Sequence, residues 1–117
     1  MNAIPFSIPA NYGQVFGAVY TSNNPDDLSE DMLDVLLPNG LLVCAGWYPD
    51  SDPNGEYVVT LTNCGRQIIR PIHTKSPHTA LLAVLDLVDQ YRWRSLNLSQ
   101  SEDISANYPP PTMANVA

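Results

Sequence analysis

Residues 41–62 read LLVCAGWYPDSDPNGEYVVTLT, and this stretch decides the predicted fold. It holds two runs that are rich in β-branched and aromatic residues, 41–48 and 57–62. Between them lies PDSDPNG, residues 49–55, whose Pro, Asp, Asn and Gly are the residues that tight turns select. The stretch therefore predicts a β-hairpin with a seven-residue connection.

The chain holds two cysteines, Cys44 and Cys64. Two are too few for the disulfide framework of a small secreted domain, and their spacing is not CxxC. In the register of the predicted hairpin, Cys44 lies opposite about Thr60 and Cys64 opposite about Gly40, so no bridge between them is expected. We therefore expect two reduced thiols and a cytoplasmic protein.

A third β-rich run, residues 67–74, follows a turn at residues 63–65. Pro71 lies inside this run. Because proline has no N–H to donate to a neighbouring strand, we expect this strand at an edge of the sheet or at a bulge.

The clearest helix begins after Ser76, a good N-cap residue, with Pro77 at the first helical position. We expect it to end at about Trp93 or Arg94. Its apolar residues cover more than the stripe that a one-sided surface helix needs. They are Ala80, Leu81, Ala83, Val84, Leu85, Leu87, Val88 and Tyr91. Either the helix is buried on two sides, or it offers one face to a partner.

A shorter helix is predicted over residues 25–37. Asn24 suits the N-cap, Pro25 suits the first helical position, and two aspartates follow where the helix dipole favours anions. Leu28, Met32, Val35 and Leu36 then recur at helical spacing, and a Pro-Asn-Gly sequence ends the pattern. The opposite face of this helix would carry Glu30, Asp31 and Asp34.

The two ends of the chain have weaker patterns. Residues 1–22 contain Pro5 and Pro9, which interrupt regular structure. Residues 14–21 show both helical spacing and a strand-like composition, and we favour the helix. Residues 97–117 are rich in Ser, Asn and Pro and are predicted to form a flexible tail.

The predicted organisation is therefore one α+β domain over residues 1–96. An antiparallel three-stranded sheet packs against the long last helix, and the shorter acidic helix precedes the sheet, in the order α-β-β-β-α. This order resembles that of the double-stranded-RNA-binding domains. That family grips RNA with lysines at the start of its last helix and with the loop between its first two strands. Here that loop carries Asp50 and Asp52, and Lys75 stands alone beside the helix, so the resemblance is one of topology only.

Charge is distributed unevenly along the chain. The first 65 residues hold eight carboxylates and no lysine or arginine, so they carry −8, whereas the rest carries +1. This sign disfavours a phosphate-binding role and leaves no basic start for a signal or transit peptide. No apolar run approaches the ~18 residues that a membrane span needs. The sequence predicts neither a nucleic-acid partner nor a membrane partner.

The hairpin connection is similar to the first half of a calcium-binding loop. Asp50, Asp52 and Asn54 place oxygens at its first, third and fifth positions, and a glycine follows at the sixth. Glu56 adds a carboxylate, but the twelfth position is Leu61 and the flanks are strands. The alternatives are a calcium site formed by Asp50, Asp52, Asn54 and Glu56 or a plain turn, and no other cofactor is predicted.

No motif in the chain predicts catalysis. There is no G-x-S-x-G elbow and no phosphate-binding loop, and both cysteines lie in or beside apolar strands, where a thiolate is costly. An enzyme or an unrecognised ligand remains an alternative. We favour a small acidic, non-enzymatic protein–protein interaction module, an adaptor, chaperone-like or regulatory protein that binds another protein or a second copy of itself.

The residues predicted to carry this interaction are of two kinds. The apolar contact is expected at Leu87, Val88, Tyr91 and Trp93. The charges that steer the encounter are expected at Glu30, Asp31 and Asp34. The alternative for the first group is that these side chains are ordinary core.

Overall fold

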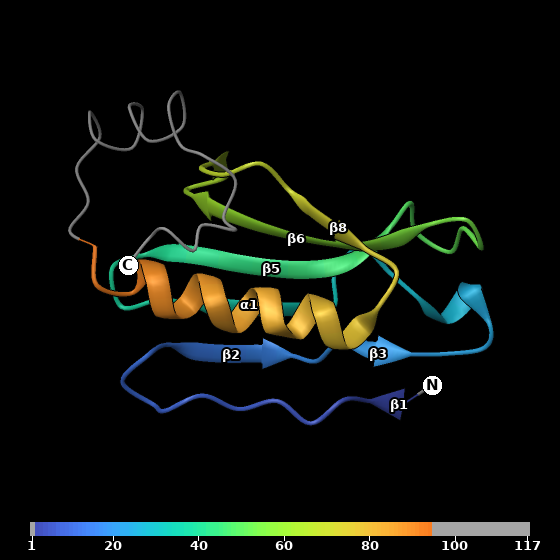
Figure 1. Ribbon diagram of the computed structural model, residues 1–117, viewed down its shortest axis with the longest axis horizontal. Coiled ribbons are helices and arrows are strands. Elements are labelled where there is room, and N and C mark those ends of the chain that lie inside the picture. The colour runs from blue at the N-terminus through green and yellow to red at the C-terminus, as the bar shows by residue number, and fades with distance from the viewer. Residues whose placement is uncertain (1, 95–117) are drawn as a thin grey trace.

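The computed structural model describes residues 2–94 and is mostly β (Figure 1). It contains a two-stranded sheet, a six-stranded sheet and one helix of 15 residues near the C-terminal end of the described chain. The elements are β1 (Asn2–Ala3), β2 (Gln14–Gly17), β3 (Tyr20–Thr21), the 3₁₀ turn η1 (Pro25–Asp27), β4 (Leu33–Leu36), β5 (Leu41–Tyr48), β6 (Glu56–Asn63), β7 (Arg66–Gln67), β8 (Ile72–Thr74) and α1 (Pro77–Tyr91).

The predicted hairpin is confirmed as β5 and β6, which form the centre of the larger sheet. Cys44 pairs with Thr60, as the register predicts. On one side of the hairpin β4 pairs with β5 and β2 pairs with β4. On the other side both β7 and β8 pair with β6. The predicted third strand is therefore peripheral, but it is split in two, and Pro71 lies in the interruption just before β8.

The predicted fold class, a three-stranded sheet with two helices, is wrong. Asn24 does cap a turn, since its side-chain oxygen accepts a hydrogen bond from the backbone N–H of Asp26 at 3.1 Å. That turn is only η1, and the chain then enters β4. Leu33, Val35 and Leu37 are buried while Leu36 is exposed, which is the period of a strand. Pairing with β2 and β5 supplies the backbone hydrogen bonds, so the helical spacing of residues 28–36 is coincidental.

The helix favoured for residues 14–21 is also wrong, because this segment forms β2 and β3. β3 pairs with β1 in the small sheet. With the first helix gone, the topological resemblance to RNA-binding domains no longer holds.

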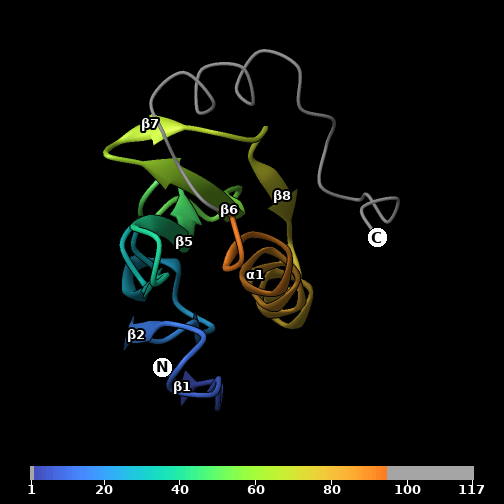
Figure 2. The same cartoon turned by 90° about the vertical axis from the view of Figure 1, so that its left-hand side faces the viewer.

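The helix α1 lies in the concave side of the curved sheet, as its end-on view shows (Figure 2). Ser76 caps it as predicted, accepting a hydrogen bond from the Thr79 N–H at 3.1 Å, and it ends at Tyr91, slightly earlier than predicted. The odd-numbered residues of β5 and β6 face α1 in the core. They are Leu41, Val43, Ala45, Trp47, Tyr57, Val59 and Leu61. The even-numbered residues therefore form the outer face of the sheet, away from the helix.

Just before β4, residues 29–32 pair with residues 45–47 of β5 and form a bulge. The Trp47 N–H donates to the Ser29 carbonyl at 2.8 Å and the Met32 N–H donates to the Ala45 carbonyl at 3.3 Å. The two residues between, Glu30 and Asp31, bulge over Gly46, where a Cβ would collide with the Glu30 carbonyl oxygen. The absence of a side chain at this position allows the bulge.

The residues predicted to form a tail, 97–117, lie outside the described residues.

Candidate interaction site

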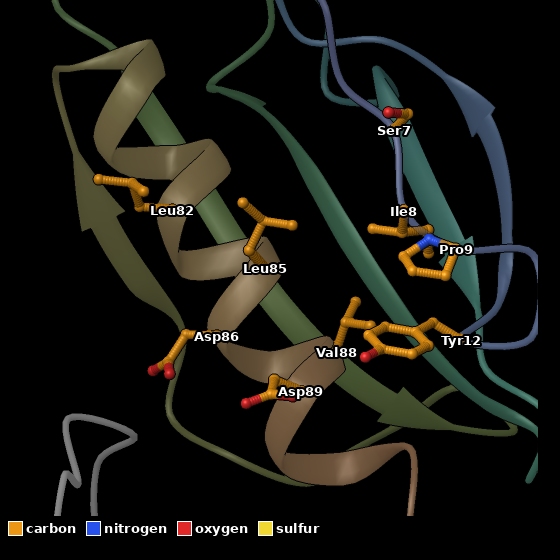
Figure 3. A pocket seen from close by; sticks show the side chains of 9 residues that line it. All are labelled: Ser7, Ile8, Pro9, Tyr12, Leu82, Leu85, Asp86, Val88 and Asp89. Atoms are coloured by element: carbon orange, nitrogen blue, oxygen red, sulfur yellow. The ribbon is translucent and has the colours of Figure 1, made fainter.

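A groove of about 420 Å³ lies between the N-terminal segment and α1 (Figure 3). One wall comes from the extended chain before β2 and the other from the exposed side of the helix. Its lining residues are Ser7, Ile8, Pro9, Tyr12, Leu82, Leu85, Asp86, Val88 and Asp89. The lining is thus largely apolar, with two carboxylates on the helix.

Helical geometry divides the lining side chains of α1 into two rows. Leu85 and Val88 point toward the N-terminal segment, whereas Leu82, Asp86 and Asp89 lie on the side of the helix farther from it (Figure 3). Spacings of three and four residues place side chains on one helix face, which explains both rows. Leu82 is 65% exposed and Leu85 is 39% exposed. Two adjacent leucines at one groove therefore remain accessible to solvent.

The N-terminal wall is attached to the end of α1 by a stack of three side chains. The guanidinium carbon of Arg92 lies 3.5 Å from the ring centroid of Tyr12 and 3.7 Å from that of Trp93. A cation between two aromatic faces is attracted to both. The segment is also fixed by a hydrogen bond from the Ile4 N–H to the Val19 carbonyl at 2.9 Å. These contacts fix the N-terminal segment to the residue that follows α1 and to the residue before β3.

The two carboxylates of the groove have weak local partners. Asp86 accepts a hydrogen bond at 2.8 Å from the neutral Gln90 amide, and one Asp89 oxygen lies 3.8 Å from an Arg92 nitrogen. Asp89 is largely exposed, while Arg92 is mostly covered by the stacked rings. The rim of the groove therefore keeps an excess of negative charge beside its apolar lining.

Of the four predicted apolar contact residues, three are buried and one is exposed. Leu87 and Tyr91 lie in the core and Val88 is only 1% exposed, although it forms part of the groove floor. Trp93 is 71% exposed, just beyond the end of α1. The accessible leucines, Leu82 and Leu85, were not among the predicted contact residues. Five of the 15 residues of α1 are polar, and Leu82 lies four residues from both His78 and Asp86, so the helical spacing of the polar residues is the signal that could have found it.

The predicted steering charges do come together, but on the outer face of the sheet. Burial, and next the carboxylate of Asp34, raise the pKa of the Cys44 thiol to about 12. Burial, and next the charge of Glu30, raise the pKa of Tyr48, with a smaller effect from Asp31. Glu30, Asp31 and Asp34 thus share one negative field, and the sheet separates them from the groove.

The predicted calcium ligands are engaged in the turn itself. Asp52 accepts a hydrogen bond from the Asn54 N–H at 2.8 Å, and Glu56 pairs with His73 at 2.7 Å. The ammonium of Lys75 donates to the Asn54 carbonyl at 3.2 Å and to the Gly55 carbonyl at 2.6 Å. Asp50 accepts from the Ser51 hydroxyl at 3.1 Å. Within residues 2–94, no group of three or more His, Cys, Asp or Glu side chains is placed to hold a metal ion.

A second hollow, of about 520 Å³, lies near the start of β2 and the end of β4. Its lining residues are Ala10, Gly13, Gln14, Leu36, Leu37 and Pro38. It has no charged side chain, and Leu36, 40% exposed, is its accessible leucine. The second hollow therefore has fewer accessible leucines than the groove and lacks its carboxylates.

No protein-family model matches the sequence, and comparison with curated proteins and with solved structures finds no significant match. Among residues 2–94, no helix is both long and apolar enough to cross a membrane. A functional conclusion therefore depends on the geometry of the site.

Proposed function

We propose that this protein is a non-enzymatic protein–protein interaction module that holds a segment of another protein in the groove between residues 7–12 and α1. The observation that carries the proposal is the pair of accessible leucines, Leu82 and Leu85, in the wall of a formed groove. Clustered exposed apolar side chains with a polar rim are typical of interaction sites. Trp93, the residue type most enriched in binding hot spots, lies at the helix end.

The three acidic residues of the outer face have a different role in this proposal. Glu30, Asp31 and Asp34 do not touch the groove occupant and act at long range, because the sheet lies between them and the groove. Their negative field raises the rate at which a basic partner approaches. Two cysteines are too few for the disulfide framework of a small secreted domain, so we also propose a cytoplasmic location.

The test is affinity capture of a partner from the native cell extract with three forms of the tagged full-length protein. These are the wild type, the double variant Leu82→Ser/Leu85→Ser, and the control Leu36→Ser. Leu36 is as exposed as Leu85 but lies at the second hollow. We expect a stoichiometric protein that the wild type and the control retain, and that the double variant retains about tenfold less, the effect of losing hot-spot residues.

Circular dichroism and thermal melting check that all three forms are folded. Equal retention by all three forms would contradict the groove as the binding site. Loss of the partner in Leu36→Ser alone would move the site to the second hollow.

A further inference from the structure

On the side of α1 that is farther from the N-terminal segment, the lining of the groove contains both an apolar side chain and carboxylates. Leu82, Asp86 and Asp89 follow each other at spacings of four and three residues, and Trp93 follows four residues later. Leu82 to Asp89 spans about 10 Å at a rise of 1.5 Å per residue. A bound segment that covers both leucines of the groove therefore also covers, or closely approaches, the two carboxylates.

Covering a carboxylate removes water from it, and the loss of hydration is costly unless an opposite charge replaces the water. Within residues 2–94, the cation recorded beside these carboxylates is Arg92, which pairs only with Asp89. Asp86 is bonded to a neutral amide, and the 3.8 Å contact between Asp89 and Arg92 is long. Arg92 is also held between the rings of Tyr12 and Trp93. A segment with its own cations therefore binds here at a lower cost than a neutral or acidic one.

The groove could also be filled by residues 95–117 of this chain or by a second copy of it, but neither is a favourable source of positive charge for the carboxylates. Residues 95–117 contain Glu102 and Asp103 but no Lys, Arg or His, so they would bring more negative charge to the rim. A second copy carries a net charge of −7 and presents the same two carboxylates. Charge complementarity therefore favours a different, basic partner.

We propose that the occupant of the groove is a partner segment whose apolar side chains cover Leu82 and Leu85 while one or two adjacent lysines or arginines pair with Asp86 and Asp89. This inference rests on the function proposed above and adds the chemistry of the partner. The carboxylates select the partner, and the leucines supply the buried apolar area.

The test uses a phage-displayed library of random 12-residue peptides, selected on the full-length protein. We expect the selected peptides to combine apolar residues with Lys or Arg. The strongest peptide is then labelled with fluorescein, and its Kd is measured on the wild type and on variants. Asp86→Asn and Asp89→Asn should each raise Kd about two- to fivefold, the range for exposed ion pairs. Asp26→Asn removes the same net charge away from the groove and should raise Kd less.

The outcomes separate the two proposals. The inference would be overturned if the selected peptides contain no basic residues and their Kd does not change with Asp86→Asn or Asp89→Asn. If these peptides still require Leu82 and Leu85, the function proposed for the groove is supported. Peptides that bind the Leu82→Ser/Leu85→Ser variant as well as the wild type would overturn both. Nuclear Overhauser contacts from the methyl groups of Leu82 and Leu85 to residues 95–117, or to a second copy in a mixed-label sample, would replace the basic partner with that occupant.

Discussion

The pKa of the Cys44 thiol is raised by its surroundings on the outer face of the sheet. Its thiol is half-buried and opposite Thr60, and burial followed by Asp34 raises its pKa to about 12. A thiol with a raised pKa keeps its proton, and only the thiolate attacks an alkylating reagent. Cys44 is therefore a poor nucleophile at neutral pH, which gives no support to an enzyme that uses this thiol.

The first prediction concerns the pH dependence of Cys44 alkylation by iodoacetamide, followed by mass spectrometry of the digested protein. Because the raised pKa lies near 12, the rate should keep rising about tenfold per pH unit through pH 8, 9 and 10 rather than level off near 9. Asp34→Asn removes the second cause of the shift and should raise the rate at fixed pH, while Asp26→Asn should not. A rate that levels off below pH 10 would contradict the prediction.

At the scale of elements, α1 has two sides that should respond differently to the same substitution. Val88 is 1% exposed and Leu82 is 65% exposed. Val88→Asp places a carboxylate in the core and should lower the free energy of unfolding by at least about 3 kcal/mol. Leu82→Asp should change it by less than about 1 kcal/mol, because the new charge stays in water. Urea denaturation followed by circular dichroism measures both, and equal stabilities would mean that Val88 is not core.

The hairpin connection gives a third prediction. Lys75, Trp47 and Asp52 already contact its backbone, Trp47 through a bond from its indole N–H to the Asp52 carbonyl at 2.8 Å. Millimolar calcium should therefore leave the melting temperature unchanged. Asp52→Ala should lower the free energy of unfolding by about 1 kcal/mol, because the turn loses the hydrogen bond to the Asn54 N–H. A rise in melting temperature with calcium that Asp52→Ala abolishes would revive the calcium site.

The elements that the sequence predicts correctly are those encoded locally. The β5–β6 hairpin has its turn residues in place, and α1 has Ser76 and Pro77 at its start. The segment from residue 25 to 37 has equally good local signals, yet its structure is decided by strands that lie elsewhere in the chain. Its period-two pattern, Leu33, Val35 and Leu37, is visible in the sequence but competes with a helical one.

The candidate site could be predicted only in part for a related reason. The acidic character of the chain and the wide apolar face of α1 follow from the sequence, and Trp93, a predicted contact residue, is exposed. Leu87 and Tyr91 face inward and Leu82 faces outward because the curved sheet covers one side of the helix. The second wall, residues 7–12, has no sequence signal beyond its prolines, which favour an extended chain.

At the scale of the whole molecule, the two sets of carboxylates lie on opposite sides of the sheet and should affect binding differently. Replacing Glu30, Asp31 and Asp34 with their amides should lower the association rate of a basic peptide, mainly at low salt, and leave dissociation unchanged. Asp86→Asn and Asp89→Asn should instead speed dissociation. Surface plasmon resonance at two salt concentrations measures both rates. A faster dissociation in the triple variant would place the outer face in direct contact with the peptide.

The stack of Tyr12, Arg92 and Trp93 joins residues that are 80 positions apart in the chain. A ribosome adds roughly 5–20 residues per second, so several seconds separate the synthesis of the two walls of the groove. The N-terminal segment emerges first and has no helix to pack against until α1 has been made. A chain whose synthesis has not yet reached α1 thus lacks one wall of this groove and cannot bind a partner through it.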